Sequence, residues 1–447
     1  MNNHSVALDE QDPTTLLLSA KTPSGLEQAT QDLSSWVSQL CGKGPAPCSL
    51  PEFAAALRDR RPLCIERRAI RVESWLDAES ALREKNRYAT ASALEDPKVI
   101  VSLPGQGTVR PGVLARLFAT APGWAEHLVR LGALAKEISG FDHLAWLGDA
   151  HADPDTVLKD NAKTQLTIFC VGVSLARWLI DLGLVPNGYV GHSLGEWIAA
   201  TLASVLSERD AVLAVHHRGR LMQSTGPGAA LIVRATAEVL SPKLPPDVTL
   251  ACVNAPNLCL VSGRPEAVAR CAEQLSAERI VTRPAPIHVA VHSPIMDAVV
   301  EPFLRELAKI TFSPPQAPIL STVTGQWMPA DLATDRTYWA RQLRATVRFD
   351  AAAETVLKEQ RLVLLEVGVG SALTSLVGMR IKDRANHRTF ALFGRDEPPP
   401  EGYPASRPFH TLGELWSSGV GIDPVRPLGQ LEVTRVVPEL PTPPTEM

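Results

Sequence analysis

The chain has 447 residues, of which 45% are hydrophobic and 21% charged, and its 44 basic and 48 acidic side chains give a formal net charge of −4. This length allows one large domain with a second unit, and the apolar content excludes a mostly disordered chain. The near balance of charges argues against a nucleic-acid-binding protein. The most apolar stretch, residues 166–185, contains Arg177 and Asp181, so we predict a buried helix there rather than a membrane span.

The N-terminal residues and the cysteines predict a cytoplasmic protein. The first residues, MNNHSVALDEQDP, lack the basic and apolar regions of a secretory signal. The seven cysteines are odd in number and form no CxxC pair, which is typical of free thiols in a reducing compartment. The histidines and cysteines show no zinc-ligand spacing, so we expect no metal site.

Residues 1–95 predict an N-terminal tail followed by a small α/β unit without chemistry of its own. Ser24 with Glu27, and Ser49 with Glu52, have the spacing of capping boxes, which mark helix N-termini. The predicted elements are a strand within 16–23, a helix over 24–40, a helix from 50 onward, a strand over 67–72 and a helix over 73–87.

Residues 96–396 predict a larger α/β domain that contains an insertion. Over residues 228–291 the pattern is strand, helix, two strands joined by a tight turn, helix and strand, which is the ferredoxin-like order. We therefore predict a large subdomain of residues 96–227 and 292–396 around a ferredoxin-like subdomain. The elements predicted for the large subdomain are strands over 98–103, 189–190, 362–367 and 389–393, and helices over 163–182, after 195 and over 208–222.

The strongest chemical signal is the G-x-S-x-G sequence of residues 191–195, which lies between a predicted strand and a predicted helix. Ser193 at the centre of such a sharp turn is exposed, and the helix N-terminus beneath it favours a developing negative charge. A serine nucleophile needs a base. Eleven histidines are available, and on chemistry alone none of them, His292 included, is preferred.

Several spaced segments carry a resemblance to a known family. They are PGQG (104–107), GHSLGE (191–196), RGRLMQ (218–223), VNAPNLCLVSG (253–263), HSPIMD (292–297), YWARQLRATVRF (338–349) and LLEVGVG (364–370). With these segments the chain resembles the acyltransferase domains of modular polyketide synthases, of the malonyl-CoA:acyl-carrier-protein transacylase family. The resemblance implies an α/β-hydrolase-like large subdomain with an inserted ferredoxin-like subdomain. It also implies that residues 1–95 correspond to a ketosynthase-to-acyltransferase linker, on which the Pro-rich residues 397–447, with a helix near 411–418, pack back.

The resemblance also implies catalytic roles. Ser193 corresponds to the nucleophile that becomes acylated, and His292 to its general base. The backbone carbonyl of Gln342 would orient the histidine, in place of the acid of a Ser-His-Asp triad. The backbone N–H groups of Gln106 and Leu194 would form the oxyanion hole.

Arg218 would be an ordinary helix arginine without the resemblance. Within RGRLMQ it corresponds to the arginine that pairs with the free carboxylate of a malonyl group, for which a planar guanidinium is well suited. The other residues that the resemblance places around the substrate are Gln165, His192, Met222, Val289 and Val291.

The segment before His292 departs from the family. Relatives that take malonyl often read HAFH and those that take methylmalonyl often read YASH, whereas this chain reads VAVH at residues 289–292. Val291 is smaller than Phe and less polar than Ser. We therefore expect a pocket that tolerates a small substituent on the α-carbon.

The sequence thus predicts an acyltransferase for polyketide biosynthesis. It would move a malonyl-type extender unit, with or without an α-substituent, from a CoA or carrier-protein thioester to the phosphopantetheine thiol of an acyl carrier protein. No bound cofactor is expected. Met1 and the absence of a ketosynthase motif favour a discrete enzyme that acts in trans on a polyketide synthase module.

Three alternatives remain open. The first is an acyl hydrolase that removes stalled acyl groups from carrier proteins with the same serine and histidine. The second is a degenerate acyltransferase that serves as a docking scaffold. The third is an α/β-hydrolase esterase, whose acid would have to be Asp210 or Asp247, between the serine and the histidine in the chain.

Overall fold

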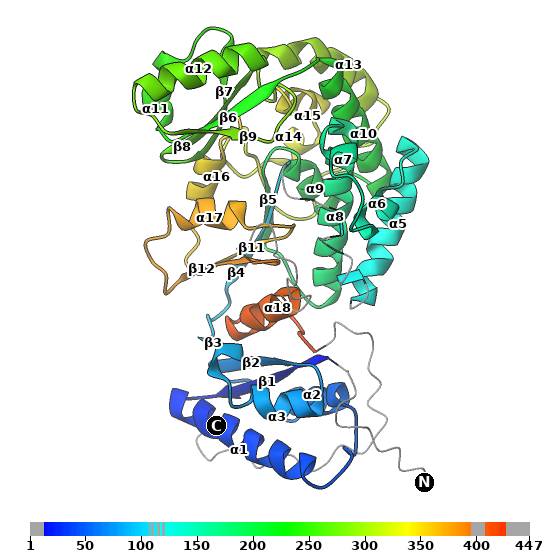
Figure 1. Ribbon diagram of the computed structural model, residues 1–447, viewed down its shortest axis with the longest axis vertical. Helices are drawn as coiled ribbons and strands as arrows, with labels where there is room; N and C mark the ends of the chain where they lie inside the picture. The colour runs from blue at the N-terminus through cyan, green and yellow to red at the C-terminus, as the bar shows by residue number, and fades with distance from the viewer. Residues whose placement is uncertain are drawn as a thin grey trace.

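The computed structural model describes residues 13–425, apart from residues 107, 108, 110, 113, 115, 116, 119, 120 and 395–406. The described chain forms three sheets with helices packed on them (Figure 1). The predicted N-terminal tail, the linker at 397–406 and the Pro-rich end lie outside the described residues.

The N-terminal unit, drawn in blue in Figure 1, is a three-stranded antiparallel sheet in the order β1-β2-β3 with helices against it. Its elements are β1 Thr14–Ala20, α1 Pro23–Cys41, α2 Leu50–Asp59, β2 Glu66–Val72, α3 Trp75–Ala81, the 3-10 turn Lys85–Arg87 and β3 Tyr88–Ser92. The capping box of Ser49 and Glu52 is present at α2. At α1 the prediction was wrong by two residues, because Thr22 caps the helix and accepts from the N–H of Gly25.

The large subdomain contains a five-stranded parallel sheet in the order β10-β5-β4-β11-β12. Its strands are β4 Lys98–Leu103, β5 Gly188–Gly191, β10 Ile319–Leu320, β11 Leu362–Glu366 and β12 His387–Ala391. Its helices are α5 Pro122–Ser139, α6 His143–Gly148, α7 Asp155–Leu158, α8 Asn161–Asp181, α9 Gly195–Leu202, α10 Glu208–Ser224, α13 Asp297–Leu307, α14 Ala330–Thr334, α15 Arg336–Gln342, α16 Phe349–Val356 and α17 Ala372–Gly378.

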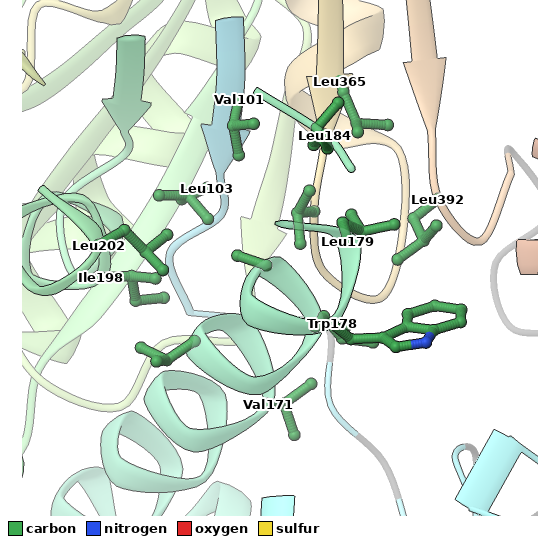
Figure 2. Close-up of a cluster of buried hydrophobic side chains, with 14 of the residues drawn as sticks. Val101, Leu103, Val171, Trp178, Leu179, Leu184, Ile198, Leu202, Leu365 and Leu392 are labelled. Carbon is green, nitrogen blue, oxygen red and sulfur yellow. The ribbon is translucent and has the colours of Figure 1, made fainter. Parts of the chain in front are cut away.

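Helix α8 is the helix predicted from the most apolar stretch, and nearly every residue of it is buried. Figure 2 shows Val171, Trp178 and Leu179 of this helix in one buried apolar cluster with Leu103 of β4 and Leu365 of β11. Of its charged residues, Arg177 is partly exposed and Asp181, the last residue of the helix, is exposed. The burial of the apolar face therefore fixes α8 against the sheet that carries the serine turn.

The inserted subdomain has the predicted order β6 Ala229–Val233, α11 Ala237–Leu240, β7 Val248–Ala255, β8 Leu258–Gly263, α12 Pro265–Ala277 and β9 Thr282–Ala285. Its four strands lie in the order β7-β8-β6-β9, and every neighbouring pair is antiparallel. This arrangement is the ferredoxin-like one, so the predicted fold class is confirmed. A small separate core, which includes Val233, Val261 and Leu275, holds its helices on its sheet.

Helix α18, Arg407–Ser417, connects the N-terminal unit with the large subdomain. It contacts β2 and β3 on one side and β12 on the other (Figure 1). No helix within the described part of the chain is both long and apolar enough to cross a bilayer. All seven cysteines are described, and all are free thiols.

Candidate active site

Ser193 lies on the sharp turn between β5 and α9, as predicted. Its φ of +53° is in the left-handed region, which is strained for a residue with a side chain. The flanking glycines are required by space, because a Cβ on Gly191 would lie 2.0 Å from the carbonyl carbon of Gly195 and a Cβ on Gly195 would lie 2.0 Å from the carbonyl oxygen of Leu103. The G-x-S-x-G pattern therefore reflects a turn pressed against β4 that holds the serine at the end of the sheet.

His292 is the histidine that meets the serine. Its Nε2 lies 2.8 Å from Ser193 Oγ, and its Nδ1 lies 2.8 Å from the backbone carbonyl of Ala345. A carbonyl can only accept a hydrogen bond, so Nδ1 carries the proton and Nε2 presents its lone pair to the serine hydroxyl. This is the tautomer that a general base needs.

The prediction for Gln342 needs a correction. The carbonyl that hydrogen-bonds Nδ1 is that of Ala345, three residues after the expected one. Helix α15 ends at Gln342, and in the turn that follows the Ala345 carbonyl faces the imidazole. The Gln342 backbone also raises the pKa of His292, but by less than the Ala345 carbonyl does. Either carbonyl replaces the acid of a triad with a neutral acceptor.

Burial is the main influence on the proton affinity of His292. Burial first and then the positive charge of Arg218 lower the pKa of the imidazole, while the hydrogen bond to Ala345 opposes both, and the resulting pKa is about 3. The imidazole is therefore neutral at physiological pH. A neutral imidazole is the form that can take a proton from Ser193.

Arg218 lies beside the nucleophile and is 1% exposed. One guanidinium nitrogen, Nη1, donates to Gln165 Oε1 at 2.5 Å, and the other, Nη2, lies 3.3 Å from Ser193 Oγ. Gln165 is itself held by Met222, whose Sδ lies 3.3 Å from Gln165 Nε2. The structure thus places three of the predicted substrate-binding residues in one buried group next to the serine.

The charge of Arg218 has no direct partner within the described residues. No described carboxylate lies within ion-pair distance of it, and its Nε has no hydrogen-bond partner among them. Burial lowers its pKa to about 10, and the more distant charge of Glu196 opposes this. A buried cation without a countercharge is costly, so the site is suited to a ligand that brings a carboxylate.

Glu196 is a buried carboxylate that the sequence analysis did not single out, although it ends the GHSLGE segment. Its oxygens accept from the N–H and hydroxyl of Thr322 and, at 2.7 Å, from the hydroxyl of Tyr338. Burial raises its pKa, while these hydrogen bonds hold it down. Its contacts tie the first turn of α9 to the loop after β10, which supports the turn that carries Ser193.

His192 was predicted to bind substrate, but its ring has a different partner. Its Nε2 lies 2.8 Å from Oδ1 of Asn254 in β7, and its ring packs against Phe349 at 5.5 Å between centroids. The side chain therefore links the serine turn to the ferredoxin-like subdomain. Asn254 belongs to the VNAPNLCLVSG segment, which was the only sequence signal for this contact.

Of the two predicted oxyanion-hole residues, Leu194 belongs to the serine turn and Gln106 lies in the segment after β4. Leu194 directly precedes α9, where backbone N–H groups have no acceptor within the helix. The chain of Gln106 follows β4, which is bound to the turn by the hydrogen bond from His192 N–H to the Leu103 carbonyl at 2.9 Å. The Gln106 side chain donates to Asn161 Oδ1, which holds this segment against α8. The Gln106 side chain is thus occupied by Asn161, and the role of the two backbone N–H groups stays a prediction.

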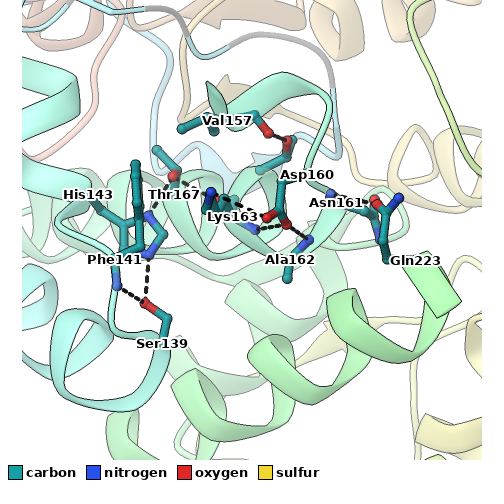
Figure 3. A network of polar contacts seen from close by, with 11 residues as sticks. Ser139, Phe141, His143, Val157, Asp160, Asn161, Ala162, Lys163, Thr167 and Gln223 are labelled. Carbon is teal, nitrogen blue, oxygen red and sulfur yellow. Dashed lines mark hydrogen bonds and ion pairs between the residues drawn. The ribbon is translucent and has the colours of Figure 1, made fainter. Parts of the chain in front are cut away.

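A pocket of about 230 Å³ opens between the two subdomains beside this site. Gln106, Asn161, Gln223 and Val289 line it, so the predicted residue Val289 faces the pocket. Figure 3 shows two of these lining residues, Asn161 of α8 and Gln223 of α10, within a wider polar network, and the Asn161 N–H donates to Gln223 Oε1 at 2.9 Å. Val291, which was also expected to shape the pocket, is 5% exposed and is not among the residues that line this one.

A larger hollow of about 670 Å³ lies elsewhere, between β3, α17, β12 and α18. None of the predicted site residues lines it. The esterase alternative also finds no support, because Asp210 is bonded to Ser207 at the start of α10 and Asp247 pairs with Arg270. Neither aspartate reaches His292, whose Nδ1 is occupied by a carbonyl.

Comparisons with known proteins agree with this geometry. The sequence model of the acyl transferase domain family matches residues 102–407. One component of the phenolphthiocerol/phthiocerol polyketide synthase of Mycobacterium tuberculosis is 30% identical over 426 residues, which cover 93% of this chain and 28% of that protein. The chain thus spans little more than a quarter of the length of this curated relative.

Solved structures show the same architecture. The acyl transferase domain of SpnD, in complex with 2-(pent-4-yn-1-yl)malonyl, is 30% identical with a TM-score of 0.82, and the match covers 95% of this chain and all of that one. A malonyl-transacylase in complex with its type II acyl-carrier protein, PlMCAT:AntF, is 26% identical with a TM-score of 0.59, covering 66% of this chain and 95% of that one.

Proposed function

The chain belongs to the acyl transferase domain family, and from this premise we propose that it transfers a malonyl-type unit from a thioester, through an acyl-Ser193, to the phosphopantetheine thiol of an acyl carrier protein. The observation that carries the proposal is the buried Arg218, which lies 3.3 Å from the Ser193 hydroxyl and has no carboxylate partner among the described residues. A malonyl group supplies that carboxylate while its thioester carbonyl is within reach of the serine.

The first half-reaction acylates the serine. Ser193 Oγ forms a bond to the thioester carbonyl carbon while its proton passes to His292 Nε2, 2.8 Å away. The oxyanion accepts from the backbone N–H groups of Gln106 and Leu194. Collapse of the adduct breaks the C–S bond, and the leaving thiolate takes the proton from Nε2.

The second half-reaction regenerates the enzyme. A phosphopantetheine thiol gives its proton to the neutral His292 and attacks the acyl-serine carbonyl. Collapse of this second adduct returns the proton to Ser193 Oγ and leaves the acyl group on the carrier. The complex of a related transacylase with its acyl-carrier protein supports this choice of acceptor, and either CoA or a second carrier protein would serve as donor.

An acyl hydrolase would use the same serine and histidine with water as the acceptor. Arg218 favours the transferase for carboxylated units, because a hydrolase of uncharged acyl chains would bring nothing to offset the buried guanidinium. Release of the acyl group as free acid, in the presence of a holo carrier protein, would favour the hydrolase instead.

We also propose that the pocket accepts a small substituent on the α-carbon. Val289 lines the pocket at the position where HAFH has a histidine and YASH a tyrosine, and valine is smaller than both. One or two methylene-sized groups in an apolar pocket change selectivity by only about 1–3 kcal/mol, so we expect tolerance rather than strict selection. The bound substituted malonyl of the SpnD domain supports this for a relative.

The experiment is intact-mass measurement of the protein after incubation with malonyl-, methylmalonyl- and acetyl-CoA. We expect one acyl adduct on the wild type, none on Ser193→Ala, and loading slowed by several orders of magnitude in His292→Ala, since the pair acts as a unit. Addition of a holo carrier protein should move the adduct to the carrier. A stable adduct on the Ser193→Ala protein would contradict covalent catalysis at this residue.

A further inference from the structure

The side chain of Gln342 contacts two residues of the site at once. It is 1% exposed, at the C-terminal end of α15. Its Nε2 donates to the backbone carbonyl of Ser193 at 2.7 Å, and its Oε1 lies 3.5 Å from Nη2 of Arg218. The expected role of this residue involved only its backbone, so these side-chain contacts call for an explanation of their own.

The two contacts determine how the amide is oriented. A carbonyl oxygen can only accept and a guanidinium can only donate, so exchanging the amide nitrogen and oxygen of Gln342 would place two acceptors together and two donors together. A carboxylate at this position would lose the donor to Ser193, and an apolar side chain would lose both contacts. The site therefore requires an amide here.

The contact with Ser193 falls on a strained residue. Ser193 has a φ of +53°, and its carbonyl also accepts from the N–H of Glu196 at 3.1 Å. The Gln342 amide is the one side-chain donor to this carbonyl in the described chain, and it comes from a different element, α15. It therefore anchors the turn from outside the strand and helix that form it.

The guanidinium of Arg218 contacts two neutral side-chain amides, and Gln342 supplies one of them. Gln165 accepts from Nη1 and Gln342 lies against Nη2, so both ends of the guanidinium have neutral oxygens beside them, and no described carboxylate lies within ion-pair distance of its charge. A carboxylate in either place would neutralise Arg218 internally and compete with the carboxylate of a substrate.

We propose that Gln342 is a positioning residue that sets both the acylation rate and the preference for carboxylated donors. Its amide holds the carbonyl of Ser193 and orients the guanidinium of Arg218 without neutralising it. This inference rests on the proposed function, since it assigns the source of malonyl selectivity at the same site.

The test compares Gln342→Glu, Gln342→Met and Gln165→Glu in loading of malonyl and acetyl groups from their CoA thioesters. In Gln342→Glu the malonyl-to-acetyl ratio of kcat/KM should fall by about tenfold or more, mainly through KM for malonyl-CoA, because the new carboxylate pairs with Arg218. Gln165→Glu is the matched control for charge, since it contacts Arg218 but not Ser193. It should lower the ratio similarly.

Gln342→Met separates the positioning role from the charge. It should slow loading of both donors by about tenfold and change their ratio by less than about threefold, because it releases the Ser193 carbonyl without adding charge. Thermal unfolding of each variant identifies any that do not fold, and Gln342→Asn, which keeps a shorter amide, should recover part of the acetyl rate.

An unchanged donor ratio in Gln342→Glu would overturn the selectivity role, and unchanged acetyl loading in Gln342→Met would overturn the positioning role. A wild-type protein that loads acetyl and malonyl equally would instead count against the proposed function. The selectivity role would then fall with it, while the acetyl rates of the Met and Asn variants would still decide whether Gln342 positions Ser193.

Discussion

At the scale of single residues, the site places a neutral base beside a buried cation. His292 and Arg218 both lie against the Ser193 hydroxyl, at 2.8 Å and 3.3 Å from it. The positive charge of Arg218 disfavours a second positive charge on the imidazole, in addition to the effect of burial. Arg218 therefore has two consequences: it offers a partner to a carboxylate, and it keeps His292 unprotonated.

This arrangement predicts that activity declines only at a pH well below the ordinary pKa of a histidine. Protonated His292 cannot act as a base, and its pKa is lowered from 6.5 to about 3, so kcat/KM for serine acylation should stay level from pH 8 down to about pH 5. Removing the cation in Arg218→Ala raises the pKa, so the acidic decline should move to higher pH. The measurement uses an acetyl thioester, because that donor has no carboxylate whose binding would also change. A decline centred near pH 6.5 in both proteins would contradict the assignment.

A site residue could be predicted from the sequence where it acts through its own side chain within a recognisable motif. The spacing of GHSLGE and HSPIMD identified Ser193 and His292 once the family resemblance was recognised, and the structure brings the two together. The carbonyl of Ala345 had no such signal, because any residue supplies a carbonyl and only the path of the turn after α15 selects this one. The side-chain contacts of Gln342 and His192 depend in the same way on elements distant in the sequence.

At the scale of elements, strands and helices with a strong apolar pattern were predicted well. The order in which strands and helices follow along the chain of the ferredoxin-like subdomain was predicted correctly. The spatial order of its strands, β7-β8-β6-β9, is set by antiparallel pairing between strands that are distant in the sequence. Strand β3 was missed, since no element was predicted between residues 87 and 98, and the helix predicted over 73–87 was too long. Helix α3 ends at Ala81, and β3 is a short strand with only Ala89 fully buried, so its alternation is weak. Its place is set by pairing with β2.

At the scale of the whole molecule, Phe409 of α18 connects the N-terminal unit with the large subdomain. Its ring is 1% exposed and meets Trp178 of α8 edge-on at 6.1 Å between centroids. The guanidinium of Arg71 in β2 lies 4.6 Å above the same ring. One side chain thus contacts both units, so α18 fixes the N-terminal unit against the domain that contains Ser193.

Phe409→Ala should therefore destabilise the protein strongly. Loss of a buried phenylalanine leaves a cavity and typically lowers the free energy of unfolding by about 3–5 kcal/mol. Leu63→Ala is the matched control in the same unit, because Leu63 is 62% exposed and its loss should change stability by about 0.5 kcal/mol or less. Chemical denaturation followed by tryptophan fluorescence measures both. Equal, small effects would show that α18 does not hold the two units together.

The central claim is that Arg218 selects a carboxylated acyl group for transfer to Ser193. The most direct measurement is a competition between malonyl-CoA and acetyl-CoA, with the acyl groups counted by mass on the peptide that contains Ser193. We expect malonyl to dominate on the wild type and the malonyl-to-acetyl ratio to fall about ten- to hundredfold in Arg218→Ala, because a charge-assisted pair is lost. The same ratio in both proteins would contradict it.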